Sequence, residues 1–290
     1  MRATFFVSAW VGRGIVAAGL VMSAFAPVAF CASTTVLFPK PLHLVRKIED
    51  PLAKSTSTVH EYCAGNRVIT VSGSKVAIAD FGKQELTEID RDAGTYSVTR
   101  FDEIAKAQAD DRRAVATKSA KHEEWKATPR GVRPSAAGRS MDSWEFVRGD
   151  EHDRTTIEVG IDRRIALSRD AVEVLVGASY PNPRRDEQDA LLRAASPGTP
   201  GGMRQATSGG GPGAAQTPAD YGLPVEQVFT FEAEGTRITL RNSVLEVTED
   251  LPPAELVIIP PGSQLVESHT ARLQRELREA DELPGQPSRP

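Results

Sequence analysis

The region between residues 42 and 101 consists of short runs of apolar and β-branched residues, separated by turn residues about every eight to twelve positions. This spacing is typical of an antiparallel meander, in which each strand reverses into the next. The pattern predicts six strands, at residues 42–48, 57–63, 67–71, 75–81, 85–90 and 95–101. Their connections contain residues that tolerate positive φ angles and so allow tight reversals, namely Ala64-Gly65-Asn66, Gly73-Ser74, Gly82-Lys83 and Asp92-Ala93-Gly94.

After Phe101 the pattern changes to one that favours helix, because Ala, Lys, Glu and Arg predominate and neither Gly nor Pro occurs before Pro129. A thin apolar stripe is formed by Phe101, Ile104, Ala105, Val115, Ala116 and Ala120. Since alanine buries little area, we expect this helix to be held less firmly than a leucine-rich core helix. Residues 129–140 are rich in Arg, Gly, Pro and Ser and predict an exposed loop.

The second half of the chain returns to strands. A hairpin with a charged tip at residues 149–153 is predicted from strands at 143–147 and 155–161, and residues 163–168 fit either a strand or a helix. Two short helices follow, one around residues 169–178 and one that begins with Asn182 as its cap and ends at Ala195. Further strands are predicted at 224–232, 236–247 and 255–259, and a charged helix at 269–283.

The tract at residues 196–222 is rich in Gly, Pro and Ser and poor in large apolar residues, so it predicts a flexible insertion. Strand patterns on both sides of it predict one α+β domain over residues 32–267, with a curved antiparallel sheet of about nine to eleven strands and helices covering one face. Residues 268–290 are expected to form a charged helical tail with a disordered end.

Residues 1–31 have the order of a secretory signal peptide. Arg2 and Arg13 are followed by an apolar stretch, and the small residues Ala29, Ala32 and Ser33 lie near Cys31 at its end. We expect cleavage after Cys31 and a periplasmic or secreted mature protein. Two alternatives stay open. One is an uncleaved anchor, since about 17 apolar residues approach the length that spans a bilayer. The other is a lipid on Cys31, although Phe30 stands where lipoprotein signals need a small residue.

The charge balance argues against nucleic-acid binding. The chain has 35 Lys and Arg residues and 39 Asp and Glu residues, and removal of residues 1–31 leaves 33 basic residues against 39 acidic ones. Basic and acidic residues are interleaved, whereas binding of a phosphate backbone needs a concentrated basic face. After cleavage only Cys63 remains, so an internal disulfide is excluded and stability must come from a packed core.

Catalytic motifs are not found. Residues 73–75 resemble the end of a phosphate-binding loop, but Val68 stands where its first glycine is needed. There is no GxSxG elbow and no HExxH pair. His60 and Cys63 suit a metal site or a nucleophile and base, but three positions apart on a strand they point to opposite faces. We therefore predict no enzyme activity, no metal and no cofactor, with a hydrolase that lacks recognisable motifs as an open alternative.

The order of elements resembles the periplasmic lipoprotein-carrier (LolA/LolB-like) superfamily and its uncharacterised envelope proteins. Arg67, Asp80, Asp90 and Tyr96 stand in a recurring pattern of strands and charged turns. The stretches that carry the resemblance are EYCAGNRVITVSGSKVAIADFGKQELTEIDRDAGTYSV at 61–98 and LPVEQVFTFEAEGTRITLRNSVLEVTEDLPPAELVIIPPG at 223–262. The resemblance implies an open, strongly curved antiparallel sheet, a half-barrel, whose concave face is covered by helices and can bind an acyl chain. The Gly/Pro insertion and the charged C-terminal helix depart from the carrier pattern.

These observations predict an exported, non-catalytic envelope protein that binds a lipid or a lipidated protein in the concave face. Period-two alternation supplies the candidate lining residues Val76, Ile78, Val98, Ile157, Val159, Phe229, Phe231, Ile238 and Leu240. The same side chains would also suit a filled core. The alternative function is that of a structural or regulatory envelope protein, which contacts a partner protein through a sheet edge or the charged C-terminal helix and needs no lipid cavity.

Overall fold

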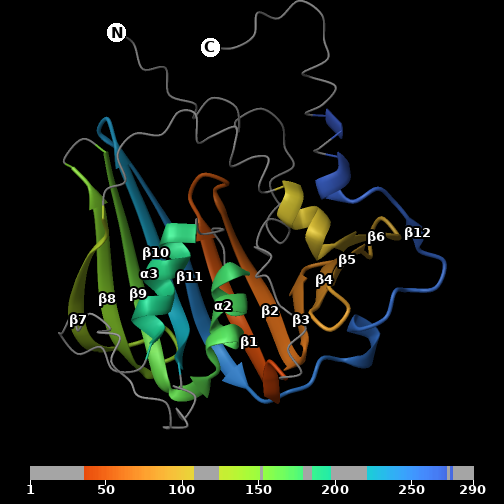
Figure 1. Cartoon of the computed structure of the whole chain (residues 1–290), viewed down its shortest axis with the longest axis horizontal. Coiled ribbons are helices and arrows are strands. Elements are labelled where there is room, and N and C mark those ends of the chain that lie inside the picture. The colour runs from red at the N-terminus through yellow and green to blue at the C-terminus, as the bar shows by residue number, and fades with distance from the viewer. Residues whose placement is uncertain are drawn as a thin grey trace, which may run out of the picture.

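A computed structural model describes residues 36–107, 124–150, 153–178, 185–196, 221–272 and 275–276. These residues form one open, curved sheet of 12 strands in the order β12-β6-β5-β4-β3-β2-β1-β11-β10-β9-β8-β7 (Figure 1). All neighbouring strands are antiparallel except β12 and β6, which are parallel. The predicted fold class is confirmed.

The meander consists of β1 (Phe38–Asp50), β2 (Ser55–Gly65), β3 (Arg67–Ser72), β4 (Lys75–Asp80), β5 (Glu85–Asp90) and β6 (Thr95–Arg100). The other strands are β7 (Lys126–Pro134), β8 (Ser140–Gly149), β9 (Asp153–Leu167), β10 (Tyr221–Ala233), β11 (Thr236–Thr248) and β12 (Gln264–Leu265). Residues 101–107 are helical, and the remaining helices are α2 (Arg169–Gly177), α3 (Arg185–Ala195) and the 3-10 helix η1 (Ala254–Leu256).

The pairing of β1 with β11 joins the two halves of the sheet. Leu44 lies opposite Val247 and Ile48 lies opposite Asn242, with an irregularity in the register between Val45 and Arg46. On its other edge β1 pairs with β2. Strands from both sides of the helical region and of the insertion therefore form one sheet, as the sequence predicts.

An aspartate shapes the turn at the end of four strands. Its Oδ1 accepts a hydrogen bond of 2.8–3.1 Å from a backbone N–H two or three residues later, at Asp50, Asp80, Asp90 and Asp150. This arrangement is the Asx turn, which fixes a reversal locally without a long-range contact. It explains why the sequence defines these hairpins well.

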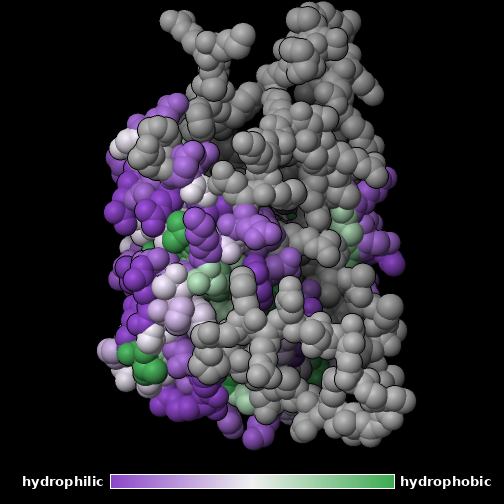
Figure 2. Space-filling view, turned by 60° about the vertical axis from the view of Figure 1, so that its left-hand side comes forward, coloured by the Kyte–Doolittle hydropathy of each residue, from purple (hydrophilic) through white to green (hydrophobic). Residues whose placement is uncertain are grey.

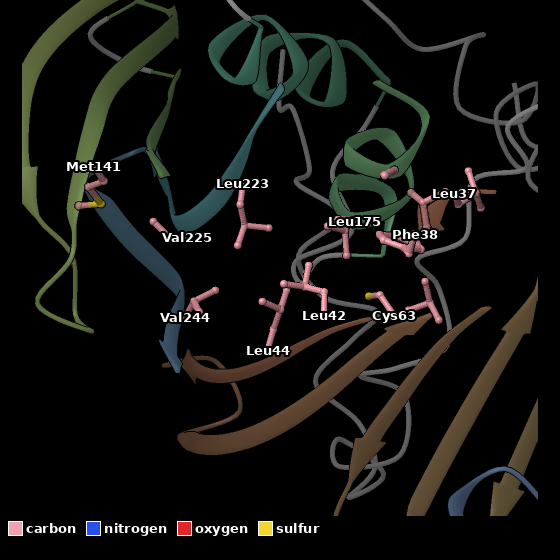
Figure 3. Packing of buried hydrophobic residues seen from close by; sticks show 13 residues of the cluster. Leu37, Phe38, Leu42, Leu44, Cys63, Met141, Leu175, Leu223, Val225 and Val244 are labelled. Atoms are coloured by element: carbon pink, nitrogen blue, oxygen red, sulfur yellow. The ribbon is translucent and has the colours of Figure 1, made fainter. Parts of the chain in front are cut away.

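The helices cover the concave side of the sheet (Figure 1). The N-cap of α2 is Ser168, whose Oγ accepts a 3.1 Å hydrogen bond from the N–H of Ala171. Leu175 of α2 points toward Leu42 and Leu44 of β1, and Cys63 of β2 lies beside them (Figure 3). The core therefore lies between the helices and the middle of the sheet.

The predicted exposed loop at residues 129–140 is wrong for residues 129–134, which are mostly exposed but belong to β7, whereas residues 135–139 connect β7 to β8, which begins at Ser140. Pro129 and Pro134 are tolerated since β7 is the last strand in the order of the described sheet, where a missing N–H breaks no ladder. Gly131, with φ 81°, lies at a register shift against β8. The described residues that are visible on this side are mainly hydrophilic, with small separate hydrophobic patches (Figure 2).

The predicted strand at residues 255–259 is also wrong. Residues 254–256 form η1, and the strand in this region is the two-residue β12. Prolines stand at 252, 253, 260 and 261, on both sides of the apolar run, and limit its backbone donors. The strand total exceeds the predicted nine to eleven because the pattern does not show β7 or β12.

Other boundaries differ by a few residues. The ambiguous residues 163–168 continue β9 as far as Leu167. β10 begins at Tyr221, so the last two residues of the predicted insertion belong to a strand. The proposed signal peptide, most of the insertion, Asn182 and most of the C-terminal helix lie outside the described residues, although residues 269–272 and 275–276 are helical.

We predict that Gly149→Ala destabilises the protein by about 3 kcal/mol. Gly149 has a φ of 96°, and an added Cβ would lie 1.9 Å from the carbonyl oxygen of Asp153. Gly235→Ala is the matched control, since its φ is 78° but no atom lies within 4 Å of the added Cβ. It should lose only about 1 kcal/mol. Urea unfolding of both variants checks the difference, and equal losses would contradict the tight β8–β9 turn.

Candidate binding face

The strands of the meander separate into two faces. On β4, Ala77 and Ala79 pack with Phe101 and Ile104 of the helical residues 101–107, whereas Val76 belongs to a different cluster. Neighbouring residues of a strand point to opposite sides. The side of the sheet that contacts residues 101–107 is called here the helix-bearing face.

The strand register extends this face across the sheet. Ala79 lies opposite Val68, and Val68 lies opposite Cys63. Residues directly opposite each other in antiparallel strands share a face. Cys63 packs in the same cluster as Leu175 of α2, so α2 covers this face as well. Burial raises the pKa of the Cys63 thiol well above its ordinary value, so Cys63 is a core residue and not a reactive one.

Four buried polar side chains lie in the middle of this face. They are Arg46, Glu61, Gln227 and Asn242, with exposed fractions of 1–3%, and are called here the polar centre. The Arg46 Nε donates a 2.6 Å hydrogen bond to the Glu61 Oε2. Gln227 lies opposite Asn242, and Asn242 lies opposite Ile48, which is two positions from Arg46. The polar centre therefore spans the four strands β2, β1, β11 and β10.

Arg46 and Gln227 each contain a buried polar atom without a hydrogen-bond partner. The Arg46 Nη1 is a buried donor, and the Gln227 Oε1 is a buried acceptor. Leaving such a group unsatisfied costs about 1–3 kcal/mol, and more for a charged group. Buried polar groups in folded proteins are nearly always bonded, so each of these atoms calls for a partner.

A row of polar residues extends from Glu61 toward the β6 edge. Thr70, Ala77, Glu88 and Ser97 lie successively opposite one another from β3 to β6. The Ser97 hydroxyl donates a 3.0 Å hydrogen bond to Glu88. Burial raises the pKa of the Glu88 carboxyl, while this hydrogen bond and the charge of Lys75 oppose the shift. The helix-bearing face thus combines a polar row with apolar clusters.

The nine predicted lining residues do not form one surface. Ile157, Val159, Phe229 and Leu240 are buried together in a cluster with α2 and α3. Phe231 packs against that cluster, and Ile238 lies opposite Phe231 on β11. Val76 and Ile78 lie on the other face, and Val98 is 41% exposed there. Alternation therefore groups residues by face but does not show which face the helices cover.

The sequence analysis missed the polar centre, although β1 contains a signal for it. Leu42, Leu44, Arg46, Ile48 and Asp50 alternate along β1 and are all buried. Two charged residues in a row of inward-pointing positions break the expected apolar pattern. A buried charge in such a position indicates a specific partner.

The opposite face carries an aromatic stack on β1 and β2. The His43 Nε2 lies 3.1 Å from the His60 Nδ1, and the rings of His43 and Tyr62 are stacked with centroids 4.1 Å apart. Burial and the charge of His60 lower the pKa of His43, although Asp250 opposes the shift. His60 and Cys63 lie on opposite faces, as predicted from their spacing.

The described residues contain no cluster of three or more His, Cys, Asp or Glu side chains placed to hold a metal ion. None of the helices in the described ranges is long and apolar enough to cross a membrane.

Gly73 occupies the turn between β3 and β4 with φ 59°, which is the hairpin expected there.

No family model matches the chain, and no curated protein matches it either. Among solved structures, a crystal structure of MucB is similar with a TM-score of 0.34 and 12% identity, over 79% of this chain and 60% of that chain. MucB in complex with MucA(peri) gives a TM-score of 0.33 and 12% identity, over 79% of this chain and 57% of that chain. The chain therefore matches less than two thirds of either MucB chain. At these values the likenesses assign neither a function nor a partner to this protein.

The raised pKa of Glu88 and the lowered pKa of His43 predict opposite effects of pH on stability. The Glu88 proton contributes stability below the unfolded pKa of about 4.3, and this is lost as the pH rises through the higher folded pKa. Neutral His43 contributes stability above the unfolded pKa of about 6.5, and this is lost as the pH falls through the lower folded pKa.

Unfolding free energies of the wild type, Glu88→Gln and His43→Gln, measured in urea from acid to neutral pH, check this prediction. Relative to the wild type, Glu88→Gln should gain stability as the pH rises, and His43→Gln should gain stability as the pH falls. Parallel curves for all three proteins would show that neither group has a shifted pKa.

Proposed function

We propose that this protein is an exported, non-catalytic binding protein that takes an amphiphile on its helix-bearing face. The observation that carries the proposal is the polar centre, in which a buried donor and a buried acceptor lack partners beside large apolar clusters. A polar headgroup would bind at the polar centre, and the apolar chain attached to it would lie among the apolar clusters between the sheet and the helices.

The headgroup must offer both an acceptor and a donor. The Arg46 Nη1 needs an acceptor, and the Gln227 Oε1 needs a donor. The Glu61 carboxylate already pairs with the Arg46 charge, so a neutral hydroxyl or amide group suits the site better than an anion. Glycerol hydroxyls or the amide of an acylated protein would meet both needs.

The apolar chain would lie beneath α3. The buried residues of this helix are Ala190, Leu191, Ala194 and Ala195 together with Glu187, so three of these five are alanine. Alanine contributes less burial energy than larger apolar residues. The end of α3 is held separately, since the Arg163 guanidinium donates hydrogen bonds of 2.5–2.8 Å to the carbonyls of residues 194–196.

Gln227→Leu tests the proposal because it should raise stability and lower affinity at the same time. Replacement of the unsatisfied amide by an apolar group of similar shape should stabilise the fold by about 1 kcal/mol. It should weaken binding of 1-monooleoylglycerol about tenfold, which corresponds to about 1.4 kcal/mol. Methyl oleate, which accepts but does not donate hydrogen bonds, is the matched probe and should bind weakly to both proteins.

Thr99→Val is the control variant. The Thr99 hydroxyl is also buried without a partner, but it lies on β6, far along the sheet from the polar centre. This variant should gain stability and keep its affinity. Tryptophan fluorescence can follow binding, since Trp144 belongs to the apolar cluster beneath α3. If Gln227→Leu bound monooleoylglycerol as well as the wild type does, the polar centre would not be a headgroup site.

Export is the second part of the proposal and rests on the sequence of residues 1–31. Mass spectrometry of the protein from its native host should give a mature chain that begins at Ala32. An intact Met1 would contradict export with cleavage, and a diacylated Cys31 would identify a lipoprotein instead.

A further inference from the structure

Exposed hydrophobic residues concentrate in one segment, residues 249–268, which is called here the strap. Of the 11 large hydrophobic residues exposed in the described part of the chain, six lie in it: Leu251, Val257, Ile258, Ile259, Leu265 and Val266. The strap runs from the end of β11 to β12 at the edge of the sheet (Figure 1). Exposed apolar residues that gather in one segment mark an interaction site more often than scattered single residues do.

The strap is held against the sheet at two places, around Glu255 and at β12. Leu256 packs into the cluster of Ile69, Val76 and Ile89 on the face opposite the helices. The Arg91 Nη2 donates a 2.5 Å hydrogen bond to the Glu255 carbonyl. The Gln264 N–H donates to Gly94 and the Val266 N–H to Tyr96, at 2.9 and 2.8 Å. The outward side chains are therefore presented on a fixed backbone, so a partner would not have to order them.

The charges of the strap are all of one sign. Glu249, Asp250, Glu255 and Glu267 are its ionisable residues, and it contains no Lys, Arg or His. Glu267 pairs with Arg275 at 2.9 Å, and Asp250 accepts a hydrogen bond from Thr248. Glu249 and Glu255 are exposed beside the apolar residues. The strap's own side chains are therefore apolar and negative, with Arg91 as a neighbouring cation at the Glu255 carbonyl.

The apolar and acidic side chains of the strap favour some kinds of binding partner over others. An anionic membrane would be repelled by the carboxylates, because membrane surfaces attract basic segments. A second copy of the chain would place like charges against each other in a two-fold contact. Prolines at 252, 253, 260 and 261 remove backbone donors, so addition of a partner strand along the strap is disfavoured. Contact through side chains with a basic partner remains.

We propose that the strap binds a basic amphipathic helix of a partner protein, with apolar side chains against Leu251 and Ile258 and Lys or Arg beside Glu249 and Glu255. Val98, exposed on β6 beside the β12 pairing, extends the apolar surface. This surface lies on the opposite side of the sheet from the polar centre, so the proposal does not depend on amphiphile binding.

The test uses fluorescein-labelled 15-residue helical peptides of Leu and Lys, with the same peptide carrying Glu for Lys as the charge control. Fluorescence anisotropy with the whole mature protein should show binding of the basic peptide only. Leu251→Ser/Ile258→Ser should weaken it about tenfold or more, since both substitutions remove apolar area that the peptide would bury. Glu249→Gln/Glu255→Gln should weaken it several-fold and reduce its salt dependence.

Val132→Ser is the matched control, because Val132 is 70% exposed but lies on β7 at the other edge of the sheet. It should bind the basic peptide as the wild type does. Equal binding of the acidic peptide, or unchanged affinity in both strap variants with native circular dichroism, would overturn the proposal. The proposal would also be overturned if Leu251→Ser/Ile258→Ser kept its affinity for the peptide but lost self-association or binding to phosphatidylcholine vesicles.

Discussion

The pairing of β1 with β11 is the constraint on which the rest of the structure depends. It joins residues 43–49 to residues 241–248, so it closes a loop of roughly the whole described chain. In the described sheet this is the link between the meander and strands β7–β11. Because antiparallel register fixes which side chains share a face, the same pairing places Arg46 and Asn242 together on the helix-bearing face. Closure of the sheet and assembly of the polar centre are therefore one event.

The polar centre makes this pairing specific at the expense of stability. A slip of β1 by one residue against both of its neighbours would turn Arg46 away from Glu61 of β2 and from the face that carries Asn242 of β11, and it would move the inward leucines of β1 to the other face. A buried ion pair contributes little net stability, since desolvation offsets most of the attraction, whereas breaking it is strongly destabilising. The unpartnered Arg46 and Gln227 atoms add a further cost. A fold that needed only stability would place apolar residues here, which is why these positions are informative about function.

The sequence predicts the parts of this fold that are local. The meander hairpins follow from alternation and from aspartates that close their own turns, and both signals lie within a few residues. β7 is not predicted because Arg, Gly and Pro at residues 129–134 are typical of a loop, and only its edge position makes them compatible with a strand. The apolar run at 257–259 suggests a strand, but flanking prolines and outward exposure exclude it. The polar centre needs a register between residues about 200 apart, for which no local pattern exists.

The two faces of the meander impose different requirements on the same strands. On β4, small Ala77 and Ala79 meet the helical residues 101–107, while the larger Val76 and Ile78 lie on the side that Leu256 of the strap covers. Antiparallel sheets commonly leave one face to solvent, but this part of the sheet is covered on both. The strap therefore has an inward residue that belongs to the core and outward residues that do not. Since the inward contact holds its backbone, the exposed side chains of Leu251 and Ile258 are not needed for the core, and their exposure as apolar residues calls for a reason outside the folded chain.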